Sequence, residues 1–139
     1  MSLRYEIVTA WPTEDVVALY DSAGWWRESA TGRAAVGAMI AGSFAFLVVT
    51  EGERAIGMGR ALSDGVSDAY IQDVVVLPSH RGRGVGVEIV RRLTGRCQEK
   101  GLVWIGLVAE PGTTAFYERL GFKAMNDFVP MRFPTPEQP

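Results

Sequence analysis

The residues best suited to chemistry lie in a short basic stretch at 81–86. It reads Arg-Gly-Arg-Gly-Val-Gly and follows an apolar run that ends at Leu77-Pro78. Glycines let backbone N–H groups come close to a ligand, and the start of a helix adds unpaired N–H donors and partial positive charge. The two arginines add full charges. The stretch therefore predicts a site for a phosphate or pyrophosphate group.

Three glycine motifs compete for this stretch. A P-loop needs Gly-Lys-Ser/Thr, which occurs nowhere in the chain, and a dinucleotide fingerprint would need its third glycine at 87 rather than at 86. The residues instead fit Arg/Gln-x-x-Gly-x-Gly/Ala. In this position after a strand, the hexapeptide resembles the pyrophosphate-binding loop of the GNAT N-acetyltransferases. The alternative is a flexible basic turn that binds nothing.

A second segment, Thr114–Phe122, resembles the C-terminal part of the same family, in which the pattern FYxxxGF is frequent. Its Phe116-Tyr117 and Gly121-Phe122 match that pattern. The two motifs lie about 30 residues apart with a strand expected between them, as in the family. The resemblance covers most of the chain and implies an acetyltransferase that uses acetyl-CoA.

The resemblance also implies where acetyl-CoA binds. The pantetheine arm would pair with the backbone of Val74, Val75 and Val76, and an N–H group there would polarise the thioester carbonyl. The pyrophosphate would lie over the turn, in contact with Arg81, Gly82, Arg83, Gly84, Val85 and Gly86. The acetyl acceptor would be a primary amine that attacks directly, without a covalent enzyme intermediate.

Two side chains are candidates for proton transfer. Tyr117 matches the family tyrosine that often protonates the departing thiolate, and the alternative is an aromatic side chain in the core. Asp73 is the first candidate for the base, because a carboxylate in a buried strand needs either a partner, or a raised pKa and a role. The alternative is an aspartate that only accepts hydrogen bonds from the backbone or from Ser or Arg side chains. Glu110 and an ordered water are the others. Gln72 stands where polyamine-acetylating relatives carry a glutamate.

The acceptor pocket of the family is partly built by the first two helices. Trp25, Trp26 and Glu28 lie in that region, together with Tyr20. Aromatic walls with one carboxylate would suit an amine that carries an apolar or aromatic group. Packing or a homodimer surface is the alternative role for the two tryptophans. His80 is expected to be exposed and is assigned no role.

The elements that must position these residues follow from periodicity and turn residues. We predict one α/β domain, residues 1–139, with the GNAT fold: a mixed, mostly antiparallel sheet with helices on both faces in the order β-αα-βββ-α-β-α-ββ. Strands are expected at 3–9, 44–50, 55–62, 70–77, 102–108, 122–125 and 127–133. Helices are expected from residue 13 to before Gly24 and at 31–40, 84–100 and 112–119. Residues 134–139 are expected to be a frayed tail.

Composition excludes several classes of function. The 139 residues carry a net charge of −2, so a basic footprint for nucleic acid is missing. No apolar stretch reaches the length of a membrane span, and no signal-peptide layout is seen, so the cytoplasm is the expected compartment. No metal site is predicted, because Cys97 and His80 are the only soft ligands. Two alternatives to a small-molecule acetyltransferase stay open: a CoA-binding module without turnover and a protein acetyltransferase.

Overall fold

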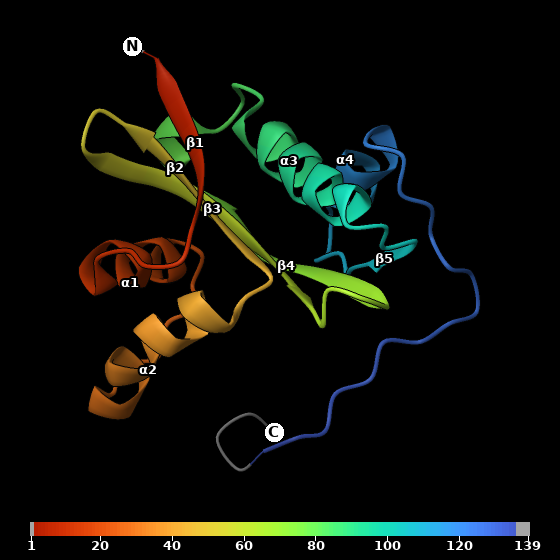
Figure 1. Ribbon diagram of the computed structural model, residues 1–139, viewed down its shortest axis with the longest axis horizontal. Helices are drawn as coiled ribbons and strands as arrows, with labels where there is room; N and C mark the ends of the chain where they lie inside the picture. Colours follow the sequence, from red (N-terminus) through yellow and green to blue (C-terminus); the bar gives the residue numbers. More distant parts are fainter. Residues whose placement is uncertain (1, 136–139) are drawn as a thin grey trace. The chain divides into compact units, whose positions relative to one another are not determined.

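The computed structural model describes residues 2–135, and the chain divides into two compact units, Met1–Leu107 and Val108–Pro139. The first unit contains a five-stranded sheet with three α-helices (Figure 1). The second contains one short α-helix. None of the helices within the described residues is long and apolar enough to cross a membrane.

The sheet has the strand order β1-β2-β3-β4-β5, in which neighbours along the chain are also neighbours in space. All pairs are antiparallel except β4 and β5, which are parallel. The predicted mixed, mostly antiparallel sheet is thus confirmed. In chain order the elements are β1 (Leu3–Val8), α1 (Thr13–Ser22), α2 (Ala30–Gly42), β2 (Ala45–Glu51), β3 (Arg54–Ser63), β4 (Asp68–Val76), the 3-10 turn η1 (Pro78–His80), α3 (Val85–Glu99), β5 (Trp104–Gly106) and α4 (Thr114–Arg119).

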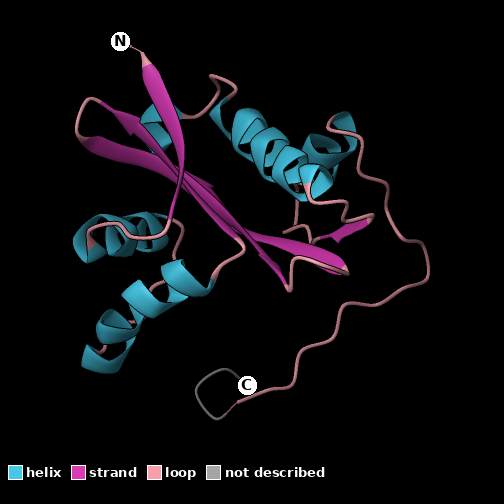
Figure 2. Ribbon diagram, viewed as in Figure 1, coloured by secondary structure: helices cyan, strands magenta, loops and turns pink. Residues whose placement is uncertain are grey.

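Helices cover both faces of the sheet, as predicted, and each face has its own apolar core (Figure 2). On one face, α3 packs on side chains of β2, β3 and β4, and this core is formed by Leu47, Val49, Ile56, Ile71, Ile89, Leu93 and Cys97 among others. On the other face lie α1 and α2, whose core includes Val16, Leu19, Tyr20, Val36, Ile40, Phe46, Met58 and Val75. Cys97 is therefore a core residue.

Glycines in β3 let α3 lie close to the sheet. A Cβ placed at Gly59 would come within 2.7 Å of Ile89 Cγ2 and 3.1 Å of Leu93 Cδ1. A Cβ at Gly57 would meet the carbonyl oxygen of Val75 at 3.2 Å. Because α3 begins at the glycine-rich turn, this close packing also fixes the start of that helix against the sheet.

The two predicted closing strands do not form. No strand occurs from residue 122 to residue 134, and β5 spans only three residues. Phe128, Val129, Met131 and Phe133 supply the β-forming residue types, but their side chains are largely exposed. A strand also needs a hydrogen-bonded neighbour, and Pro130 removes one backbone donor from this stretch. In the predicted tail, residues 136–139 lie outside the described part of the chain.

Candidate active site

The strand that leads into the glycine-rich turn has one open edge. On one side, β3 pairs with β4 as far as Val76, whereas on the other side β5 pairs only with the first three residues, Asp68–Tyr70. Beyond Tyr70, the β5-facing edge of β4 has no strand partner among the described residues. Its backbone donors and acceptors are therefore available to an extended ligand.

The hydrogen-bond pattern shows which residue faces that open edge. Leu77 donates its N–H to the carbonyl of Ile56 at 2.9 Å, and Val76 lies opposite Gly57. In antiparallel strands, bonded and non-bonded pairs alternate. Val75 and Leu77 thus direct their polar backbone groups to β3, while the N–H and C=O of Val76 point to the open edge. Of the three valines predicted to pair with the pantetheine arm, Val76 is therefore the one whose backbone groups point to the open edge, whereas those of Val75 point to β3.

Arg81 confirms the direction of the Val76 carbonyl. Its Nε donates a hydrogen bond to that oxygen at 3.0 Å. The guanidinium therefore lies at the end of the open edge, where the strand turns into the basic stretch. A positive charge at this point favours an anionic ligand that follows the strand.

The turn itself has the geometry expected of an anion site. Gly82 and Gly84 have φ values of +77° and +78°, which L side chains rarely adopt, and a Cβ at either would meet nothing within 4 Å. Glu88 donates to the carbonyl of Gly84, and no side chain caps the helix. The N–H groups of Val85 and Gly86 consequently lack helical acceptors and carry the positive end of the helix dipole.

β4 bulges at Asp73. Two residues, Asp73 and Val74, lie opposite the single residue Gly59 of β3, and Asp73 has φ +59°. Aspartate tolerates this left-handed conformation better than most side chains do. Ile71 packs on the α3 side and Val75 on the other side, although four residues apart in a regular strand share a face. The bulge therefore changes which face the side chains take as the strand approaches the turn.

Of the possibilities that the sequence left open for Asp73, the structure shows hydrogen-bond partners. Its Oδ2 accepts a hydrogen bond from the Tyr20 hydroxyl at 2.7 Å and another from Arg60 Nε at 2.8 Å, with Arg60 as an ion pair. Burial, followed by the hydrogen bond to Asp73, raises the pKa of Tyr20, so the phenol stays protonated as a donor. Within residues 2–135, the side-chain hydrogen bonds that reach this carboxylate both end on Oδ2.

Aromatic rings gather around this network. The rings of Trp25 and Trp26 each have their centroid 6.4 Å from that of Tyr20. The Tyr20 hydroxyl also lies 3.3 Å from the sulfur of Met39. Trp25 is 38% exposed, whereas Trp26 is half-buried. The sequence-predicted tryptophans and Asp73 are thus brought to one place, with Tyr20 between them.

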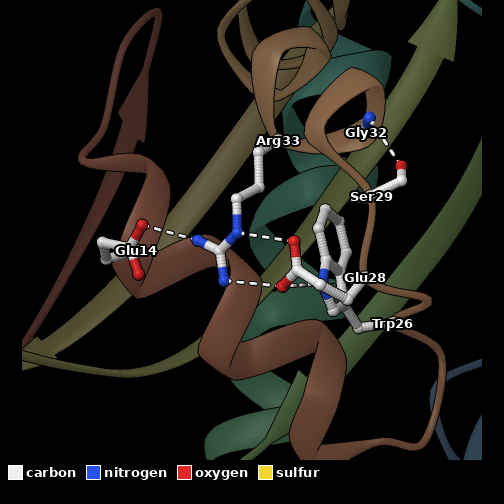
Figure 3. A network of polar contacts seen from close by, with 6 residues as sticks. All are labelled: Glu14, Trp26, Glu28, Ser29, Gly32 and Arg33. Carbon is white, nitrogen blue, oxygen red and sulfur yellow. Dashed lines mark hydrogen bonds and ion pairs between the residues drawn. The ribbon is translucent and has the colours of Figure 1, made fainter.

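Glu28 lies in a polar network that includes Arg33, Glu14 and the indole of Trp26 (Figure 3). Arg33 bonds both of its carboxylate oxygens at 2.8 Å and also pairs with Glu14, and the Trp26 indole N–H donates to Glu28 at 3.3 Å. The hydrogen bonds from Arg33 and Trp26 lower the pKa of Glu28. An incoming ammonium group would have to displace Arg33 to reach this carboxylate.

Tyr117 belongs to the second compact unit. It lies in α4, half-buried, with its ring centroid 4.9 Å from that of Phe116 and 5.8 Å from that of Phe122. Burial raises the pKa of the Tyr117 hydroxyl, and the negative charge of Glu110 raises it further. The hydroxyl therefore remains a proton donor throughout the neutral range.

These features agree with a comparison of the whole sequence. The sequence pattern of the Acetyltransferase (GNAT) family matches residues 5–122. The chain belongs to the GNAT acetyltransferase family. GNAT acetyltransferases use acetyl-CoA, and the open edge, the left-handed glycines and the free helix N-terminus fit its pantetheine arm and pyrophosphate.

Among GNAT relatives, Serotonin N-acetyltransferase 2, chloroplastic, from Oryza sativa subsp. japonica is 44% identical over 76 residues, which are 55% of this chain and 38% of that protein. Histone acetyltransferase TAP1 from Glycine max is 33% identical over 118 residues, 79% of this chain and 51% of that one. The chain thus spans about half, or less, of these curated relatives. The structure of a GNAT family acetyltransferase from Streptococcus pneumoniae TIGR4 superposes with a TM-score of 0.82 at 23% identity, covering 97% of this chain and 99% of that one.

Sequence reasoning missed three residues at this GNAT site. Arg60 and Glu51 gave no local signal, because each meets its partner only through the sheet and turn geometry. His80 was expected to be exposed, and that expectation is wrong: it is 5% exposed, and both ring nitrogens have partners. Within residues 2–135, no group of three or more His, Cys, Asp or Glu side chains is placed to hold a metal ion.

Proposed function

We propose that this GNAT protein transfers an acetyl group from acetyl-CoA to the primary amine of a small molecule with an aromatic or apolar body. The observation that carries the cofactor part is the open edge of β4, which ends at Val76 and continues into the glycine turn. An extended arm with a diphosphate at its end matches an edge of free backbone groups followed by a helix N-terminus.

Different residues of the chain would bind different parts of acetyl-CoA. Val76 offers its backbone N–H to the pantetheine arm, whereas its carbonyl already accepts a hydrogen bond from Arg81, and Val74 lines the same stretch. The turn from Arg81 to Gly86 holds the diphosphate through its N–H groups, and Arg83 adds positive charge. Bound acetyl-CoA supplies the activated acetyl group; the protein supplies binding, orientation and proton transfer.

Two residues would move the protons. The amine attacks in its neutral form, so a new C–N bond forms while the C–S bond breaks. Asp73 accepts the proton of the ammonium on Oδ1, since Oδ2 is occupied by Tyr20 and Arg60. Tyr117 donates its proton to the leaving thiolate, in the role of the matching family tyrosine, and the second proton that the nitrogen loses on forming the amide returns to the tyrosinate through solvent. Glu110 and an ordered water are the alternative bases.

The aromatic rings support the choice of acceptor. Tyr20 contacts the carboxylate of Asp73, and the rings of Trp25 and Trp26 lie beside the Tyr20 ring, an arrangement that suits a cationic head on an aromatic body. The rice relative is named for acetylating serotonin, an arylalkylamine. Gln72 cannot provide the negative charge with which a glutamate would hold a second ammonium of a polyamine. Glu28 is not needed in this scheme, because Arg33 already binds it.

Two other functions use the same fold. A protein acetyltransferase is favoured by one observation: the soybean relative with that title aligns with 79% of this chain. A CoA-binding module without turnover would retain the turn and dispense with proton transfer. The three functions differ in whether thiol is released from acetyl-CoA and in which amine triggers its release.

An amine panel separates them. Thiol release from acetyl-CoA is measured with an arylalkylamine, with spermidine and with a lysine-containing peptide. We expect the arylalkylamine to give the highest kcat/KM, and Trp25→Ala to lower it by about two- to tenfold while spermidine is unaffected. A preference for spermidine or for the peptide would overturn the proposed acceptor. CoA binding without any thiol release would favour a CoA-binding module without turnover over both acetyltransferase functions.

A further inference from the structure

The buried histidine before the glycine turn has no part in the proposed reaction. His80 ends η1 and is 5% exposed, and Thr50 is the only other polar residue buried to this degree in the described part of the chain. Burial of an imidazole ring is unfavourable unless both ring nitrogens are paired. The partners of His80 therefore indicate what the ring does.

Both ring nitrogens have partners. Nδ1 lies 2.7 Å from Ser79 Oγ, and Nε2 lies 3.1 Å from Oε1 of Glu51. A neutral ring protonated on Nε2 satisfies both contacts, because it accepts from the Ser79 hydroxyl and donates to the Glu51 carboxylate. The hydrogen bond from His80 lowers the pKa of Glu51, so Glu51 is the charged acceptor of this pair.

Glu51 belongs to a different part of the sheet from the turn. It is the last residue of β2, where the hairpin to β3 begins. The His80–Glu51 contact thus joins η1 to the β2–β3 hairpin across 29 residues of sequence. η1 itself connects the end of β4 to the turn, and His80 donates its backbone N–H to Leu77 within it.

The place where the glycine turn begins is held by this contact together with two others, the bond from the Leu77 N–H to Ile56 and the bond from Arg81 to the Val76 carbonyl. Glycine is the most flexible residue type, and at Gly82 and Gly84 a Cβ would meet nothing within 4 Å. A turn that must be ordered before it can bind a diphosphate binds more weakly than one that is already ordered. His80 is the last side chain before Arg81 that is fixed to the body of the sheet.

We propose that His80 is a positioning residue for acetyl-CoA: through Glu51 it fixes the 3-10 turn from which the diphosphate-binding turn starts. This inference rests on the proposed function, because it assumes that CoA binds at Arg81–Gly86. His80 and Glu51 act through the backbone of the turn and do not touch the substrate. Their loss should therefore affect the binding of acetyl-CoA and spare the chemical step.

Because Glu51 is negatively charged, electrostatics and a positioning role predict opposite changes in CoA affinity when it is removed. The carboxylate is close enough to the turn for the charge of Arg83 to lower its pKa. By electrostatics alone, removing a negative charge beside an anion site should tighten CoA binding. A positioning role requires the opposite, so Glu51→Ala should weaken CoA binding.

The experiment measures CoA affinity by calorimetry and steady-state kinetics on the full chain. We expect Glu51→Ala and His80→Leu each to raise the CoA Kd and the KM for acetyl-CoA on the order of tenfold, the scale of one hydrogen bond to a charged group. The kcat at saturating acetyl-CoA and the KM for the amine should stay within about twofold. Glu51→Gln keeps an oxygen acceptor for Nε2–H and should recover part of the loss.

Two further variants complete the series. The double variant His80→Leu, Glu51→Ala should bind CoA no more weakly than the worse single variant, because both remove one contact. Glu53→Gln, on the same hairpin, is the control and should bind as the wild type does. If His80→Leu does not fold, Glu51→Ala alone still shows whether loss of the contact weakens or tightens CoA binding.

Unchanged or tighter CoA binding by Glu51→Ala would overturn the inference, as would equal losses in kcat and KM. Gly84→Asp separates this failure from failure of the proposed function. If Gly84→Asp abolishes CoA binding while Glu51→Ala does not weaken it, the site is correct and the positioning role is wrong. If Gly84→Asp binds CoA normally, the proposed site is wrong and the inference falls with it.

Discussion

The hydroxyl of Tyr20 donates a hydrogen bond to Oδ2 of Asp73 over 2.7 Å, which ties α1 to the bulge of β4. Arg60, on β3, donates to the same oxygen at 2.8 Å. The carboxylate is thereby held from two sides through one oxygen. In the proposed function, Asp73 is the residue at which the acceptor side of the site and the cofactor strand would meet.

Replacement of Asp73 by asparagine removes the charge at nearly constant shape. If Asp73 takes the proton from the amine, Asp73→Asn should lose the most rate at low pH, where the amine stays protonated. The measurement is kcat/KM for the amine as a function of pH. Tyr20→Phe serves as the control, because it removes one hydrogen bond and leaves the carboxylate. A folded Asp73→Asn protein with the wild-type pH profile would transfer the role of base to Glu110 or water.

Tyr117→Phe should lower kcat far more than it raises the KM for acetyl-CoA, because the hydroxyl would act in thiolate departure. General acid catalysis contributes roughly 10²–10⁴-fold, so a loss below about threefold would rule out the role. Steady-state kinetics with the best amine of the panel gives both constants.

The raised pKa of Tyr117 determines at which alkaline pH the rate of acetyl transfer should fall. An acid is lost as pH rises through its pKa, so the wild-type rate should not fall until pH exceeds the ordinary phenol value of ~10. Glu110→Gln removes the negative charge that helps to raise the pKa of Tyr117, so the alkaline fall in rate should move to lower pH. If Tyr117→Phe shows the same alkaline fall as the wild type, that fall belongs to another group.

Stability should respond in opposite directions to alanine at two glycines. Gly59→Ala places a Cβ 2.7 Å from Ile89 and should lower the free energy of unfolding by about 1–3 kcal/mol. Gly95→Ala, inside α3 where a Cβ meets nothing within 4 Å, should raise it by about 0.5–1 kcal/mol. Urea unfolding measures both. Equal effects at the two positions would contradict the close packing of α3 on β3.

Some parts of this site were predictable because their signals are local in sequence. The turn at Arg81–Gly86 combines glycines, arginines and a helix start within six residues, and each contributes a known property to anion binding. Asp73 in an apolar strand was expected, on energetic grounds, to have either a partner or a raised pKa and a role. The identity of its partners was not predictable, because Arg60 and Tyr20 are 13 and 53 residues away in the sequence.

Other parts depend on geometry that residue patterns do not encode. The bulge at Asp73 depends on the register between β3 and β4, and it decides that Val76 faces the open edge while Val75 faces β3. His80 looked exposed because its neighbours in sequence are polar, yet Glu51 comes to it from the hairpin. The apolar residues at 127–133 favoured a strand, but pairing rather than residue type determines where a strand forms.

The central claim is that CoA binds at the glycine turn, and calorimetric titration of CoA into two matched variants tests it most directly. Gly84 and Gly101 flank α3, have φ values of +78° and +79°, and leave open space for a Cβ, so an aspartate causes equal backbone strain at each. Only Gly84→Asp places a negative charge at the proposed diphosphate site. We expect Gly101→Asp to bind CoA as the wild type does and Gly84→Asp to show no binding. Equal affinity in the two variants would contradict the account.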